Sequence, residues 1–181
     1  MATSSDCADN IVLIGFMGAG KSTVGRLLAR QSGRHFLDVD TLIAAACGMP
    51  VAEIFEKEGE AAFRRMERQS AQWLAKCVRG SVVSTGGGMP LAVDTLRKIG
   101  TVVYLKLPFA SVMKRIDARE RARRPLFKDP ENAEMLFKER EERYESQADI
   151  VVDADRPPEA VAEEIMRRLA DGAVAGLPGG E

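Results

Sequence analysis

The residues with the most evident chemistry form a glycine-rich segment near the N-terminus, Gly15-Phe-Met-Gly-Ala-Gly-Lys-Ser22. The segment matches the pattern G-x-x-x-x-G-K-[ST], in which glycines let backbone N–H groups turn toward phosphate oxygens. The lysine of this pattern reaches the β- and γ-phosphates, and the hydroxyl that follows it binds Mg²⁺. A glycine-rich turn without a ligand is the alternative. We expect a nucleoside triphosphate and Mg²⁺ at Gly18, Ala19, Gly20, Lys21, Ser22 and Thr23.

Two carboxylates with one residue between them, Asp38 and Asp40, come at the end of a second short apolar run. Phosphoryl transfer to an alcohol needs oxygen ligands for the metal and an acceptor for the proton of the nucleophile. A pair of acids one crossover after a phosphate loop fits both needs. A solvated turn or a helix cap is the alternative.

Arg64 and three successive glycines are further candidates. Arg64 stands near the start of a long amphipathic pattern and offers a planar fork to a carboxylate, while an ion pair with Glu60 or Glu67 is the alternative. Gly86, Gly87 and Gly88 follow a strand-like run. Three glycines in a row lose much conformational entropy on folding, and this cost is expected where a ligand must contact the backbone directly. A plain loop remains the other interpretation of the triplet.

The many charged residues of segment 118–128 favour its interpretation as a mobile lid, which would bring an arginine to the transferring phosphate. A nucleic-acid patch is the rival interpretation. Phe127 is the only aromatic residue in the segment, so the bases of a nucleic acid would find little to stack on.

Apolar runs and helical periodicity alternate along the chain and must position these residues. Strands are expected at 11–14, 36–39, 81–84, 101–107 and 150–152, and helices at 21–31, 60–77, 89–99, 108–117, 130–147 and 157–169. Such alternation predicts one α/β domain with a mostly parallel sheet, whose ligands bind beyond the carboxyl ends of the strands. We expect disordered tails at 1–9 and 171–181, around a domain at 10–170.

Composition excludes several classes of protein. The 181 residues carry 26 Lys and Arg against 27 Asp and Glu, so no overall field attracts nucleic acid or an anionic membrane. The longest apolar run is about half of the roughly 20 residues that a membrane span needs. Three cysteines without CxxC spacing and an N-terminus without basic residues predict a cytoplasmic protein. A single histidine, His35, argues against a histidine-based metal site or triad.

Six motifs, taken together and in this order, resemble the shikimate kinase family. They span about residues 10–170. The resemblance implies a P-loop NTPase fold of the nucleoside monophosphate kinase type, with a five-stranded parallel sheet flanked by helices. It also implies substrate-binding helices at about 40–78 and a lid at about 118–128. The motifs are Gly15-Phe-Met-Gly-Ala-Gly-Lys-Ser22, Phe36-Leu-Asp38-Val-Asp40, Phe63-Arg64-x-x-Glu67, Gly86-Gly-Gly88, Arg124-Pro-Leu126 and Arg140-x-x-x-Tyr144.

The resemblance also implies a reaction: transfer of the γ-phosphate of ATP to the 3-hydroxyl of shikimate, giving shikimate 3-phosphate and ADP in the pathway to chorismate and the aromatic amino acids. Asp40 is then the base and holds ring hydroxyls, while Arg64 and Arg140 hold the shikimate carboxylate. Backbone at the glycine triplet, at Gly86, Gly87 and Gly88, completes the acceptor site.

On the nucleotide side, the resemblance implies that Lys21 and Arg124 bring positive charge to the phosphates. Ser22 and Asp38 hold Mg²⁺, and Arg156 lies by the adenine. No acid follows the strand at 81–84, where a P-loop ATPase often carries a metal ligand. Mg²⁺ must therefore depend on Ser22 and, directly or through water, on Asp38. The lid is richer in charge than the resemblance implies, which leaves Arg119, Arg121 and Arg123 without roles.

Two rivals remain. Another small-molecule kinase of the same architecture, such as one acting on gluconate, shares the phosphate loop but not the Phe-Arg-x-x-Glu motif followed by the glycine triplet. A regulatory nucleotide switch would need guanine recognition, and the chain has no Asn-Lys-x-Asp motif. We expect the protein to act as a monomer on a small molecule, without nucleic acid or membrane.

Overall fold

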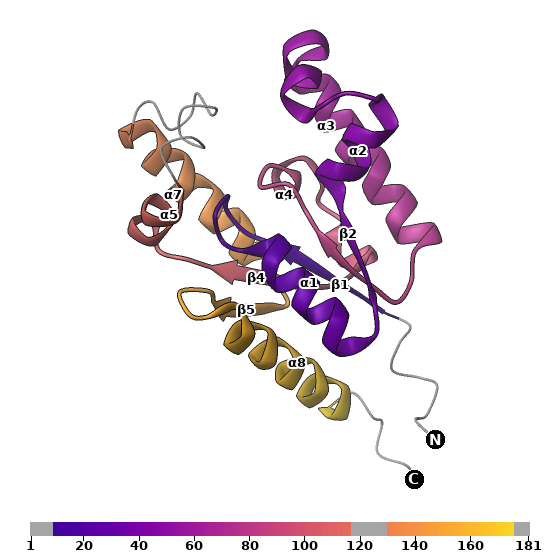
Figure 1. The fold of residues 1–181 in the computed structure, drawn as a ribbon, viewed down its shortest axis with the longest axis vertical. Helices are drawn as coiled ribbons and strands as arrows, with labels where there is room; N and C mark the ends of the chain where they lie inside the picture. Colours follow the sequence, from indigo (N-terminus) through magenta and orange to yellow (C-terminus); the bar gives the residue numbers. More distant parts are fainter. Residues whose placement is uncertain (1–8, 117–129, 176–181) are drawn as a thin grey trace.

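The computed structural model describes residues 9–116 and 130–175, and a parallel five-stranded sheet forms its centre (Figure 1). The strand order is β2-β3-β1-β4-β5, and all of its pairings are parallel, which confirms the predicted five-stranded parallel sheet. β1 is buried along its whole length, because it has neighbours on both sides and helices over both faces. The strands are β1 (Asn10–Ile14), β2 (His35–Asp38), β3 (Ser81–Ser84), β4 (Gly100–Lys106) and β5 (Ile150–Asp153).

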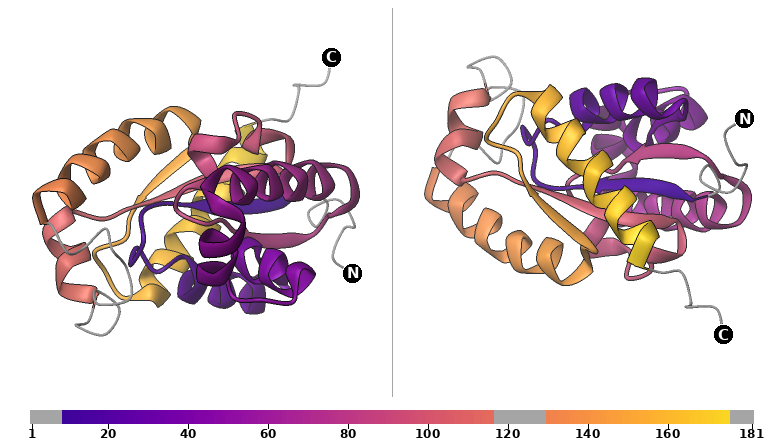
Figure 2. Two further views of the ribbon diagram at one scale, coloured as in Figure 1. Left: turned by 90° about the horizontal axis from the view of Figure 1, so that it is seen from above. Right: turned by 90° about the horizontal axis from the view of Figure 1, so that it is seen from below.

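Helices cover the two faces of the sheet (Figure 2). α1 and α8 lie side by side on one face, and α3, α4 and α7 lie on the other, as right-handed crossovers require for this strand order. No helix within 9–116 or 130–175 has both the length and the apolarity that crossing a membrane demands. The helices are α1 (Lys21–Ser32), α2 (Val39–Cys47), α3 (Val51–Cys77), α4 (Met89–Ala92), the 3-10 helix η1 (Leu96–Lys98), α5 (Phe109–Arg115), α7 (Pro130–Gln147) and α8 (Pro158–Ala175).

The strand register places the ends of β1, β2 and β3 at one level. Asp38 of β2 and Leu13 of β1 both pair with Ser84 of β3. Because the three strands run in the same direction, the segments that follow them emerge together at one edge of the sheet. These segments carry the phosphate loop, Asp40 and the glycine triplet.

A buried amide ties the opposite edge of the sheet together. Asn10 donates hydrogen bonds to the carbonyls of Val78 and Ile99, at 2.8 and 2.9 Å, and accepts one from the Ser81 amide at 3.0 Å. Its side chain is 1 % exposed, so these bonds replace those that water would make. The starts of β1 and β3 are thereby fixed relative to each other.

The predicted helix at 89–99 is wrong. α4 ends after one turn, Val93 is extended with φ −131° and ψ 113°, and η1 follows. The Gln147 amide donates to the carbonyls of Pro90 and Val93 at 2.6 and 3.2 Å, and Arg143 donates to Pro90 at 3.2 Å. These side chains of α7 occupy carbonyls that a longer helix would use for its own bonds, so tertiary contacts override the local pattern.

Two helix ends also differ from the prediction. α8 runs to Ala175, past the position where the C-terminal tail was expected to begin, and an i,i+4 ion pair from Arg167 to Asp171 at 3.0 Å supports the extension. α3 begins at Val51 and bends at Gly59. The φ of 79° and ψ of 168° at Gly59 lie outside the helical region, so the helical hydrogen bonding is interrupted there. The expected start at residue 60 marks this bend.

Candidate active site

The phosphate loop joins β1 to α1 and ends at Gly20, the cap residue of α1. Gly20 has φ 88° and ψ 14°, a left-handed conformation that costs other residues about 1–2 kcal/mol. This turn directs the N-terminal amides of α1 toward the edge of the sheet, where a helix favours an anion. The Lys21 ammonium group donates to the carbonyls of Gly15 and Phe16, at 2.8 and 3.0 Å, and so lies over the loop.

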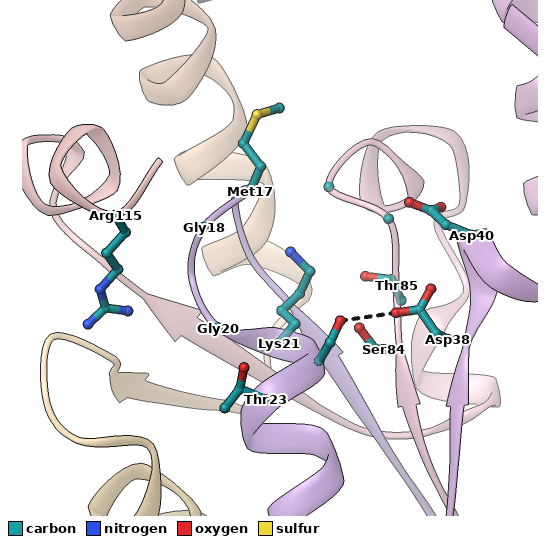
Figure 3. Close-up of a pocket in the computed structure, with 13 residues that line it drawn as sticks. Met17, Gly18, Gly20, Lys21, Thr23, Asp38, Asp40, Ser84, Thr85 and Arg115 are labelled. Atoms are coloured by element: carbon teal, nitrogen blue, oxygen red, sulfur yellow. Dashed lines mark hydrogen bonds between the residues drawn. The ribbon is translucent and has the colours of Figure 1, made fainter. Parts of the chain in front are cut away.

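A cavity of about 410 Å³ opens beside this loop (Figure 3). Its walls come from the ends of β1, β2 and β3 and from α5. The cavity therefore brings together four segments that are far apart in the sequence. Its lining residues are Met17, Gly18, Gly20, Lys21, Ser22, Thr23, Asp38, Asp40, Ser84, Thr85, Gly86, Gly87 and Arg115.

Ser22 and Asp38 form an oxygen pair in the cavity. The Ser22 hydroxyl donates to Oδ2 of Asp38 at 3.1 Å, as the dashed line in Figure 3 shows. Oδ1 of the same carboxylate accepts from the Thr41 amide at 3.2 Å and thereby caps α2. The cap fixes the carboxylate, so the cap and ligand interpretations of Asp38 are compatible. Hydroxyl and carboxylate oxygens suit a hard cation such as Mg²⁺.

The first glycine of the triplet packs against Asp40. A Cβ built on Gly86 would lie 2.5 Å from Oδ1 of Asp40, closer than a real Cβ allows. Asp40 is half-buried in the first turn of α2, and it lines the cavity beside Asp38 (Figure 3). Only glycine leaves room for this carboxylate at the end of β3.

The third glycine packs against Arg64. A Cβ built on Gly88 would overlap the Arg64 guanidinium group, which donates to Glu60 and to Glu67 at 2.8 Å each. Arg64 therefore makes the ion pairs with Glu60 and Glu67 that were the alternative to a ligand role, and it also lies against the glycine triplet. Glu67 is fully buried, so this pair is not a surface contact. Arg64 and Gly88 do not line the cavity of Figure 3 but continue its wall through the triplet.

Burial is the largest single influence on the pKa of each member of this pair, but it prevails only at Glu67. Loss of hydration raises the pKa of the Glu67 carboxyl, and the attraction of Arg64 only partly offsets this effect. The pKa of Arg64 is raised as well: burial opposes its charge, but hydrogen bonds to Glu67 and Glu60 outweigh that cost. Asp40 and Arg140 also act on Glu67, which brings the predicted acceptor-site residues within electrostatic reach of one another.

Arg140 and Arg156 lie outside the cavity lining. The Arg140 guanidinium carbon is 5.7 Å from the centre of the Phe16 ring, which places it on α7 against the phosphate loop. Arg156 is exposed after β5, and its Nε donates to the Asp153 carbonyl at 3.3 Å. Arg124 and the whole predicted lid at 118–128, with Arg119, Arg121 and Arg123, fall outside the described residues, as does the predicted tail at 1–9 apart from Asp9.

Four cavity residues were not among the predicted site residues: Met17, Ser84, Thr85 and Arg115. Thr85 directly follows β3, so the rule that ligands bind beyond strand ends would have found it. Arg115 ends α5 on the side of the phosphate loop away from Asp38 and Asp40 (Figure 3), and it donates to the Ala154 carbonyl at 2.8 Å. No local pattern distinguishes Arg115 from the other basic residues of its helix, because only packing brings it to the loop.

Comparisons with known proteins agree with one another. A family model described as shikimate kinase matches residues 17–170. The shikimate kinase of Helicobacter hepaticus is 42% identical over 163 residues, which cover 90% of this chain and 95% of that protein. The family-model match includes the phosphate loop from Met17 onward and all of the acceptor-side motifs.

Solved structures show the same relationship. A shikimate kinase from Acinetobacter baumannii, in complex with shikimate, has a TM-score of 0.81 and 33% identity, and the match covers 91% of this chain and 94% of that one. A gluconokinase from Sinorhizobium meliloti has a TM-score of 0.58 and 20% identity, with coverages of 93% and 95%. The latter likeness concerns the fold alone.

Proposed function

The chain belongs to the shikimate kinase family, and from this we propose that it transfers the γ-phosphate of ATP to the 3-hydroxyl of shikimate, giving shikimate 3-phosphate and ADP. The observation that carries the proposal is the contact between the glycine triplet and Asp40 inside the cavity of the phosphate loop. An acceptor bound at the triplet would thus meet a phosphate held by the loop. The reaction belongs to the pathway to chorismate and the aromatic amino acids.

On the nucleotide side, the loop amides from Gly18 to Thr23 bind the phosphates of ATP, and Lys21 balances their charge. The ammonium group exchanges its bonds to the loop carbonyls for phosphate oxygens. Arg115 lines the same cavity and adds a guanidinium group on the far side of the loop. Arg124 and Arg156 stay predictions as a lid arginine and a neighbour of the adenine.

Ser22 and Asp38 are the residues that would hold Mg²⁺. No group of three or more His, Cys, Asp and Glu side chains within the described ranges has the arrangement to hold a metal. The Ser22 hydroxyl and the Asp38 carboxylate offer two oxygens, which suits a Mg²⁺ that binds chiefly through nucleotide phosphates and water. When bound, the ion neutralises charge that develops on the phosphate oxygens.

On the acceptor side, Asp40 accepts the proton of the attacking hydroxyl at its carboxylate and orients the ring hydroxyls. Gly86 leaves space for this carboxylate. The guanidinium groups of Arg64 and Arg140 hold the carboxylate of shikimate, supported by backbone at Gly87 and Gly88. Positioning and fixed positive charge supply most of the rate in this type of reaction.

The deciding experiment measures ADP release by the purified protein with ATP and Mg²⁺, with and without shikimate. We expect release to depend on shikimate and to stay at background with gluconate. Turnover with gluconate but not shikimate would favour the rival kinase, and tight guanine-nucleotide binding without acceptor-dependent turnover would favour a switch. A monomeric state and a cytoplasmic location stay predictions, to be checked by light scattering and by fractionation of cells.

A further inference from the structure

A tyrosine that the proposed reaction does not use contacts the glycine triplet. Tyr144 of α7 is fully buried, and its hydroxyl donates to the Gly87 carbonyl at 2.6 Å. A Cβ built on Gly87 would lie 3.7 Å from this hydroxyl and also 3.7 Å from the Gly15 carbonyl oxygen and the Met17 amide nitrogen. Gly87 is therefore held between α7 and the phosphate loop.

The same hydroxyl also contacts Arg140, a residue proposed to bind the substrate carboxylate. Arg140 stands one helical turn before Tyr144 and donates a hydrogen bond to its hydroxyl oxygen. Burial raises the pKa of Tyr144 to about 12, against the opposing effect of Arg140, so the hydroxyl keeps its proton at neutral pH. One oxygen thus donates to Gly87 and accepts from Arg140.

The hydrogen bond from Tyr144 to the Gly87 carbonyl also affects the orientation of the next residue, Gly88. The peptide unit between Gly87 and Gly88 is planar and trans, so a carbonyl fixed on Tyr144 directs the Gly88 N–H to the opposite side. Gly88 in turn abuts the Arg64 guanidinium group. The orientation of one peptide plane therefore sets the positions of two proposed carboxylate ligands relative to the backbone.

We propose that Tyr144 is a positioning residue for the phosphate acceptor: its hydroxyl holds Arg140 and the Gly87 peptide in the geometry that grips the acceptor carboxylate. This inference rests on the proposed function, because the acceptor is taken to be shikimate. Tyr144 itself touches neither nucleotide nor acceptor in this scheme. Its effect passes through Arg140 and the triplet.

Other side chains already hold the segment in place. Gln147 donates to the carbonyls of Pro90 and Val93, and Arg143 donates to Pro90 and pairs with Asp94. The Tyr144 ring packs on Tyr104 with a centroid distance of 5.3 Å. Removal of the hydroxyl alone leaves these contacts intact, so a Tyr144→Phe variant is expected to fold.

The experiment compares steady-state constants of the wild type, Tyr144→Phe, Tyr104→Phe and Gln147→Met. In Tyr144→Phe we expect KM for shikimate to rise about tenfold, because Arg140 and the Gly87 carbonyl lose a shared partner. KM for ATP and kcat should stay within about twofold, since the lost contact serves acceptor binding. Calorimetric titration of shikimate should show the same loss of affinity.

Two controls separate positioning from structure. Tyr104→Phe removes the hydroxyl of the only other tyrosine, and Gln147→Met removes bonds farther along the same segment. Both should keep the wild-type KM for shikimate, although Gln147→Met should unfold at a lower temperature. A wild-type KM in Tyr144→Phe, or an equal rise in Gln147→Met, would overturn the inference and leave a structural role. Absence of shikimate-dependent turnover in the wild type would instead overturn the proposed function, and this inference with it.

Discussion

Lys21 and Asp40 stand at the two reacting ends in the proposed transfer. Both line one cavity, so charge on the phosphates and the proton of the acceptor are handled within the same space. Lys21→Met or Asp40→Asn should lower kcat by about 10²–10⁴-fold, because each removes a group that acts in the transition state. Stopped-time ADP assays measure the loss, and circular dichroism checks the fold. Near-normal turnover in Asp40→Asn would remove it as the base, while the exposed Lys76→Met serves as control.

Arg64 joins the glycine triplet to a buried acid, and its proposed role is specific for the acceptor. Arg64→Ala should raise KM for shikimate between about ten- and a hundredfold, the worth of hydrogen bonds to a charged group, and leave KM for ATP nearly unchanged. Stability should also fall, because Glu67 keeps a buried charge without its partner. The exposed neighbour Arg65 offers a matched Arg65→Ala control. A selective loss of ATP affinity would contradict the role of Arg64.

Glu67 gives a test of which electrostatic effect dominates at the triplet. Its pKa is raised by burial, so the folded protein holds this proton to higher pH than the unfolded chain does. The contribution of Glu67 to stability is therefore greatest at low pH and declines as pH rises through the window between the two pKa values. Denaturant unfolding of wild type and Glu67→Gln from about pH 4 to pH 7 measures this decline as a difference. A difference that grows with pH would show that the ion pair with Arg64 outweighs burial.

At the scale of elements, the start of α4 packs directly on α3. Gly88 has φ −93° and ψ −16°, which alanine adopts without strain, yet a Cβ there would displace the Arg64 guanidinium group. Gly88→Ala should therefore lower the unfolding temperature, because displacement of Nη1 of Arg64 weakens its bond to the buried Glu67 carboxylate. We expect KM for shikimate to rise about tenfold from the misplaced arginine.

The matched control lies in α8. A Cβ on Gly172 would meet nothing within 4 Å, so Gly172→Ala tests the same substitution in a helix without a neighbour. It should leave both Michaelis constants unchanged. An unchanged KM for shikimate in Gly88→Ala would show that Arg64 does not need its place against the triplet.

At the scale of the whole molecule, we expect the unfolding temperature to be independent of bound metal. Within the described residues no set of three acidic, histidine or cysteine side chains can hold a metal ion. Chelation with EDTA should stop ADP release, while the unfolding temperature of the nucleotide-free protein stays constant. Excess Mg²⁺ should restore turnover. A fall in unfolding temperature on chelation would reveal a structural metal instead.

Most strands of the sheet were predictable because they are short apolar runs, whereas β2, with the sequence His-Phe-Leu-Asp, carries little periodicity of its own. The run that became β1 and the glycine pattern after it lie within about a dozen residues, so neighbours in the chain define them. The helix at 89–99 was not predictable in the same way. Its periodicity is helical, but Gln147, more than fifty positions later, holds Pro90 and Val93 in another conformation.

On the acceptor side of the site as well, contacts between distant residues could not be predicted from the sequence. Arg64 and the glycine triplet were recognisable as types of residue, whereas the burial of Glu67 and the placement of Arg115 were not. Each depends on which helices meet, and helix packing follows from strand order rather than from periodicity. The ion-pair and ligand interpretations of Arg64 looked exclusive in the sequence and proved compatible in space.

The sequence by itself determined the phosphate loop, because a short run of residue types specifies its backbone conformation locally. It also determined the parallel sheet through the alternation of strands and helices, and the family through six ordered motifs. Only the tertiary structure decided that Gly86 meets Asp40, that Gly88 meets Arg64 and that Tyr144 reaches Gly87. These contacts join residues far apart in the chain. Their free energy comes from close packing and shared hydrogen bonds between elements, which no local pattern contains.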